Sequence, residues 1–203
     1  MGTLREVFGP SKKEIWKILC EQTGSEFVKG SFTKSDKVIA HCRDWTITLD
    51  TYVVSTGKSH TTYTRIRAPY VNSEGFRFSI YRRGIFTALG EYLGFHDIEI
   101  GSFDFDKDFV IKASNEDKVR ELFSDEHLRK LMENQPRFHL QVKDDEGWFG
   151  TSFPDGVDEL HFIVQGVLKD VDKLKALFEL FSEVLDGLCK IGAAYEGDSG
   201  VIL

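Results

Sequence analysis

His96–Ala113 reads HDIEIGSFDFDKDFVIKA, and its pattern says more about the fold than any other stretch of the chain. Apolar and polar residues alternate strictly over Asp97–Ile100, which is the period of a half-buried strand. The alternation resumes at Phe103–Asp106, slips at Lys107–Asp108 and restarts in Phe109–Ile111. Because a slip of one residue moves side chains to the opposite face of a sheet, the pattern predicts two short strands joined by a turn or bulge at the slip, or one strand with an irregular corner.

Three carboxylates of this stretch are candidate metal ligands. On a strand, Asp104, Asp106 and Asp108 would share one face, where they could meet a hard cation such as Ca²⁺. The spacing is not that of an EF-hand loop, because Phe109 and Asn115 stand where that loop requires Gly and Glu. The alternative is a solvated acidic face with aromatic residues packed behind it, since charged side chains usually lie outside unless they are paired.

Four arginines form a candidate anion-binding cluster. Arg65 and Arg67 would share a face of a strand predicted at Thr61–Ala68, and Arg82 and Arg83 follow the next predicted strand. Together they could hold a small anion or a nucleotide. The alternative is a basic face that balances the acidic stretch, in which each pair of opposite charges across a sheet contributes about 0.2–1 kcal/mol.

Composition narrows the class of protein. The chain has 203 residues, 41% of them hydrophobic and 13% aromatic, which is typical of a globular protein with a sizeable core. The net charge of −7 repels phosphate backbones and argues against a nucleic-acid partner. Cys20, Cys42 and Cys189 are far apart and form no CxxC motif, which favours a reducing compartment over a disulfide framework. We expect a cytoplasmic protein, with neither a signal peptide nor a membrane span.

The patterns along the chain predict three groups of helices. Ser11 and Glu14 have the spacing of a capping box at the start of an N-terminal helix, which Gly24 ends. A pair of short helices follows the central stretch, the first over Glu116–Phe123. The last helix begins after Asp170 and carries a wide apolar stripe. Between these helices, strands are predicted at Glu26–Phe32, Lys37–Arg43, Trp45–Val54, Thr61–Ala68, Phe76–Tyr81, Phe138–Lys143, Trp148–Ser152 and Glu159–Val167.

Most of the predicted strands follow one another as hairpins, and the order of the predicted elements contains no βαβ repeat. The sequence therefore predicts an α+β fold with a mainly antiparallel sheet or sheets, flanked by an N-terminal helix, a central helix pair and a long C-terminal helix. One domain over residues 1–203 is expected, with the possibility of two lobes at residues 11–113 and 114–192. Pro69 should end its strand, because proline cannot donate to a ladder. Gly84–Gly94 should form a short helix or an irregular turn.

The phrase carried by Phe105, Asp106, Phe109 and Ile111, placed before a helix pair, resembles a domain of uncharacterised bacterial proteins. This resemblance implies no activity, no cofactor and no catalytic residue. Phosphate-binding Gly-rich loops and the Gly-x-Ser-x-Gly motif are absent from the sequence.

Three functional hypotheses result. The leading one is a non-enzymatic cytoplasmic domain of bacterial origin that binds a protein or a small molecule and needs no cofactor. The second is a metal-assisted hydrolase that uses Asp104, Asp106 and Asp108, with His96 as a further candidate. The third is binding of a small anion or nucleotide by the four arginines.

Overall fold

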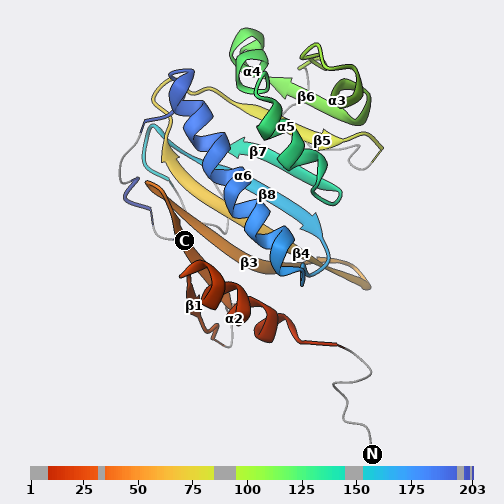
Figure 1. The fold of residues 1–203 in the computed structure, drawn as a ribbon, viewed down its shortest axis with the longest axis vertical. Coiled ribbons are helices and arrows are strands. Elements are labelled where there is room, and N and C mark those ends of the chain that lie inside the picture. Colours follow the sequence, from red (N-terminus) through yellow and green to blue (C-terminus); the bar gives the residue numbers. More distant parts are fainter. Residues whose placement is uncertain (1–8, 32–34, 85–94, 145–152, 196–198, 202) are drawn as a thin grey trace, which may run out of the picture.

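The structure is a computed structural model, which describes residues 9–31, 35–84, 95–144, 153–195, 199–201 and 203. A single eight-stranded antiparallel sheet dominates it, in the strand order β1-β2-β3-β4-β8-β7-β5-β6 (Figure 1). The strands are β1 Glu26–Val28, β2 Lys37–Cys42, β3 Trp45–Thr56, β4 Ser59–Val71, β5 Phe78–Arg82, β6 Phe109–Ala113, β7 Phe138–Lys143 and β8 Val157–Gln165. The helices are α2 Lys12–Thr23, α3 Phe103–Asp108, α4 Glu116–Leu122, α5 Glu126–Glu133 and α6 Val171–Lys190. The predicted α+β class and its flanking helices are confirmed.

The sheet joins strands from both halves of the chain. The late strands β7 and β8 lie between β4 and β5, so that β8 pairs with β4 from Tyr63↔Gln165 to Val71↔Val157. Strands from residues 11–113 and from residues 114–192 therefore share one continuous hydrogen-bonded sheet.

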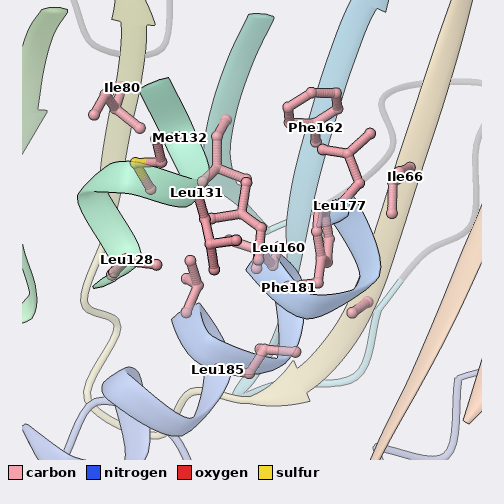
Figure 2. Close-up of a cluster of buried hydrophobic side chains, with 14 of the residues drawn as sticks. Ile66, Ile80, Leu128, Leu131, Met132, Leu160, Phe162, Leu177, Phe181 and Leu185 are labelled. Atoms are coloured by element: carbon pink, nitrogen blue, oxygen red, sulfur yellow. The ribbon is translucent and has the colours of Figure 1, made fainter. Parts of the chain in front are cut away.

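The long helix α6 packs across the middle of one face of the sheet (Figure 1). Its apolar stripe is buried, as the spacing predicts, and Figure 2 shows Leu177 and Phe181 beside the sheet residues Ile66 and Phe162. The rings of Phe162 and Phe181 meet edge to face, with 6.4 Å between their centroids. Asp170 caps the helix by accepting a hydrogen bond from the Lys173 amide.

The N-terminal helix α2 begins with the predicted capping box. The Ser11 hydroxyl accepts from the Glu14 amide, and the Glu14 carboxylate accepts from the Ser11 amide. Trp16 is fully buried, and its ring nitrogen donates to the Leu168 carbonyl oxygen at 3.2 Å, which ties the helix to the segment before α6. Gly24 ends the helix in the left-handed conformation (φ 71°), as expected.

The central stretch differs from its strand prediction. Phe103–Asp108 forms the short helix α3, and only Phe109–Ala113 is a strand. The predictions of a strand at residues 97–100 and at residues 103–106 were therefore wrong. Local side-chain bonds explain the outcome, because the Asp106 carboxylate accepts from the amides of Ile100 and Gly101 and holds the chain in a turn.

Pro69 does not end its strand, contrary to the prediction. The pairing of β3 with β4 stops at Thr48↔Arg67, whereas β4 continues beside β8 as far as Val71. Pro69 thus lies where β4 has a paired neighbour on one side, and a residue without an amide hydrogen is tolerated there.

The predicted strand Trp148–Ser152 lies outside the described residues, as does Gly84–Gly94 apart from Gly84. No helix in the described ranges is long and apolar enough to cross a membrane.

Candidate functional site

The sheet has a second face, opposite the one that α6 covers, and we call it the polar face. Cα partners in an antiparallel sheet share a face, so the register places one row of side chains across six strands. This row contains Thr48, Arg67, His161, Gln141, Ser79 and Lys112. Thr48, Arg67, His161, Gln141 and Ser79 are all buried. Such a concentration of buried polar groups is uncommon, because each group needs a partner.

Asp50 is the centre of an ion-pair network on the polar face. Arg65 donates to both of its oxygens, at 2.9 and 2.7 Å, and Arg67 Nη2 donates to Oδ2 at 2.8 Å. Burial alone would raise the pKa of Asp50, but the hydrogen bond from Arg65 and the two positive charges outweigh it and hold that pKa below its ordinary value. The Arg65 guanidinium also lies 5.1 Å from the centre of the Tyr52 ring. Both arginines thus serve a buried carboxylate of the protein itself.

Glu159 lies beside this network and is fully buried. Its Oε2 atom is 3.9 Å from Arg67 Nη1, and neither carboxylate oxygen has a hydrogen-bond partner. Burial raises the pKa of Glu159 to about 7, although the charges of Arg67, Arg65 and Lys143 oppose that shift. The sequence analysis did not identify Glu159 as a site residue. The pattern that could have identified it is the alternation of Glu159 and His161 with apolar residues, which places both on one face of a strand.

Two buried histidines complete the polar face. His139 Nε2 is 2.7 Å from the Ser79 hydroxyl, which is the separation of a nucleophile and its base. Both residues are almost wholly inaccessible, so the pair is closed to a substrate in this structure, and burial lowers the pKa of His139 to about 3. Burial also lowers the pKa of His161 well below its ordinary value.

Arg82 and Arg83 lie at the end of β5, in a different place from Arg65 and Arg67. Arg82 donates to the Asp108 carboxylate at 3.0 Å and to the Glu133 carbonyl oxygen at 2.7 Å. Arg83 donates to the Asp97 carboxylate at 2.6 Å and also contacts the Asp106 carbonyl oxygen. The four predicted arginines therefore form two pairs, and the second pair balances the acidic stretch.

A pocket of about 460 Å³ opens beside this second pair. We call it the basic pocket, and it is lined by Arg82, Arg83, Lys107, Asp108, Gln135, Pro136 and Arg137. Lys107 and Arg137 are exposed and make no hydrogen bond or ion pair with the described part of the chain. Gln135 is only 4% exposed, and neither its amide nitrogen nor its amide oxygen has a partner. Sequence reasoning missed Lys107, Gln135 and Arg137, because only the fold brings the start of β7 beside the end of β5.

The three candidate metal ligands, Asp104, Asp106 and Asp108, all lie on α3. The Asp106 carboxylate accepts hydrogen bonds from two backbone amides, and the Asp108 carboxylate forms an ion pair with Arg82. Asp104 is exposed on the same short helix. His96 lies 3.7 Å from Glu116 and is largely exposed. Within the described ranges, no group of three or more His, Cys, Asp or Glu residues is placed to hold a metal ion. The metal hypothesis stays a prediction.

The sequence matches no protein-family model and no curated protein. Among solved structures, the fold is similar to the crystal structure of the mycobacterial trehalose monomycolate transport factor A, TtfA. The TM-score is 0.54 at 10% sequence identity, over 87% of this chain and 94% of that one. At this identity the similarity concerns the fold alone.

Proposed function

We propose that this chain is a non-enzymatic binding domain that takes a small anion in the basic pocket. The observation that carries the proposal is a pocket with four cationic side chains, Arg82, Arg83, Lys107 and Arg137, against the single carboxylate of Asp108. Anions are bound in proteins by such convergent groups, and guanidinium groups match the oxygens of phosphates and carboxylates especially well.

The cations of the pocket divide into two kinds. Arg82 and Arg83 are each held by a carboxylate and a backbone carbonyl oxygen, so their guanidinium groups are already ordered before a ligand arrives. Lys107 and Arg137 have no competing partner in the described chain and are available to the ligand. An ordered pair together with an available pair lowers the entropic cost of binding.

Gln135 adds a polar group that lacks a partner. Its buried amide carries two N–H donors and one acceptor oxygen, and leaving such a group unsatisfied costs about 1–3 kcal/mol. Because Nε2 is itself buried, the Gln135 side chain must turn towards the pocket before Nε2 can donate to a ligand oxygen.

The structural neighbour is named a transport factor, and a binding role without catalysis is compatible with that name. We propose that the protein is located in the cytoplasm of a bacterium. Its three widely separated cysteines suit such a reducing compartment.

Thermal melts at constant ionic strength test the proposal, with phosphate, sulfate, pyrophosphate and citrate as ligands and chloride as the reference anion. A ligand at a hundred times its Kd stabilises the fold by about 2.7 kcal/mol, which at this size corresponds to a rise in Tm of roughly 5–10 °C. We expect such a rise with at least one of the multivalent anions, confirmed by calorimetric titration.

A matched pair of variants separates site binding from general charge. Lys107→Ala/Arg137→Ala removes the two available cations of the pocket, whereas Lys13→Ala/Lys169→Ala removes two exposed cations elsewhere. The proposal requires at least a tenfold loss of affinity in the first variant and little change in the second. Equal losses in both, or no multivalent anion that shifts Tm, would reject it.

A further inference from the structure

A group of buried polar atoms on the polar face has no hydrogen-bond partner. The group consists of both carboxylate oxygens of Glu159, the amide oxygen of Gln141 and the Nδ1 atom of His161, all of them buried and without a partner. The sheet register brings them together: His161 lies directly opposite Gln141, and Glu159 precedes His161 by two residues on the same face of β8. An ionised Glu159 cannot bond to Gln141 Oε1, because both atoms only accept.

The neighbouring cation does not resolve this shortage. Arg67 places Nη2 at 2.8 Å from Asp50 but Nη1 at 3.9 Å from Glu159, which is beyond hydrogen-bond distance. A fully buried carboxylate without hydrogen bonds is costly as an ion, and the usual response of the protein is to neutralise it.

We propose that Glu159 is a proton-binding site inside the sheet, held as the carboxylic acid with its O–H donating to Gln141 Oε1 or His161 Nδ1. In this form the side chain supplies a donor to Gln141 Oε1, which only accepts, or to His161 Nδ1 where the His161 proton is on Nε2. Loss of the proton leaves a second carboxylate beside Arg67, which then competes with Asp50 for the guanidinium. The site therefore couples the proton concentration to the ion-pair network of the polar face, independently of the basic pocket.

The charges that face Glu159 act on its pKa in opposite directions. Arg67 and Arg65 on β4 and Lys143 on β7 favour the ionised form, whereas burial and Asp50 on β3 favour the acid. Burial is the largest influence and brings the pKa to about 7. His139 and His161 stay neutral at this pH, since burial lowers the pKa of each.

Carbon-detected NMR of the glutamate side-chain carboxyls tests the proposal directly. We expect one carboxyl resonance of the wild-type chain to titrate with a midpoint between pH 6 and 8, and to be absent from Glu159→Gln. If every glutamate carboxyl of the wild type titrates below pH 5.5, the proposal is wrong. The wild-type titration decides the matter even if the variant does not fold.

A stability measurement gives a second, independent readout. Glu159→Gln replaces the acid by an amide that also donates, so it mimics the protonated form without its titration. Because the pKa of Glu159 is raised in the folded chain, its contribution is complete below about pH 4.5 and is lost as the pH rises to about 7. The ratio of the wild-type folding constant to that of Glu159→Gln should fall nearly tenfold per pH unit between about pH 5 and 7.

The exposed Glu121→Gln serves as the matched control, and its ratio to the wild type should stay constant over the same interval. A constant ratio for Glu159→Gln as well would overturn the proposal. An internal water molecule that donates to an ionised Glu159 is the alternative that this result would favour.

Discussion

Arg67 and Asp50 form a buried ion pair across β3 and β4, with 2.8 Å between Arg67 Nη2 and Asp50 Oδ2. Arg65 contributes two more hydrogen bonds to the same carboxylate. One aspartate thus pairs with two arginines on a face where both Asp50 and Arg67 are less than a tenth exposed. The stability of the sheet should depend on this carboxylate far more than on any surface ion pair.

Asp50→Asn should destabilise the fold by about 3–5 kcal/mol, because it removes the carboxylate that accepts hydrogen bonds from both Arg65 and the buried Arg67. Urea denaturation measures the effect. Asp144→Asn is the matched control, since it breaks the exposed pair of Asp144 with Arg77 and should cost about 0–1 kcal/mol. Similar losses in the two variants would contradict the assignment of Asp50 as the centre of the network.

His139 should make the fold sensitive to acid. Burial lowers its pKa in the folded chain to about 3, against an unfolded value of 6.5, so its contribution is present above about pH 6.5 and is lost as the pH falls towards 3. The free energy of unfolding should fall by roughly 1.4 kcal/mol per pH unit from this residue between pH 6 and 4. In His139→Asn this part of the slope should disappear, whereas His127→Asn, an exposed control, should retain it.

Gly187 should resist replacement by alanine although it lies within α6. Alanine normally stabilises a helix by about 1 kcal/mol relative to glycine. A Cβ at this position would meet Leu122 Cδ1 at 2.6 Å, so the buried leucine of α4 must shift. We expect Gly187→Ala to cost about 1–2 kcal/mol.

A double-mutant cycle checks the cause of this loss. In a Leu122→Ala background the contact is absent, and Gly187→Ala should there become stabilising. If Gly187→Ala destabilises equally in both backgrounds, contact with Leu122 is not the reason.

Asp106 should stabilise the chain without a metal ion. Its carboxylate accepts from two backbone amides, and Asp106→Ala should therefore cost about 1–3 kcal/mol in the presence of EDTA. Melts with Ca²⁺, Mg²⁺, Mn²⁺ or Zn²⁺ should leave the wild-type Tm unchanged. A rise with one cation that Asp106→Asn abolishes would instead support the metal hypothesis.

Local signals in the sequence determined the helix ends and most of the strands. Ser11 and Asp170 act as N-caps where the sequence indicates them, because a cap depends on residues only two or three positions apart. The wide apolar stripe of α6 likewise indicated its buried face. The same local reasoning failed at Phe103–Asp106, where alternation indicated a strand but the chain forms a helix, and the Asp106 carboxylate accepts a hydrogen bond from the Ile100 amide.

Only the tertiary structure decided which polar residues meet. The sequence grouped Arg65, Arg67, Arg82 and Arg83 by charge, whereas the fold separates them into a buried pair on Asp50 and a second pair in the basic pocket. Strand alternation assigns a residue to a face but does not select its neighbours, which depend on pairing between distant segments. The placement of β8 between β4 and β7 brings Glu159 beside Arg67, and no periodicity within either strand encodes that contact.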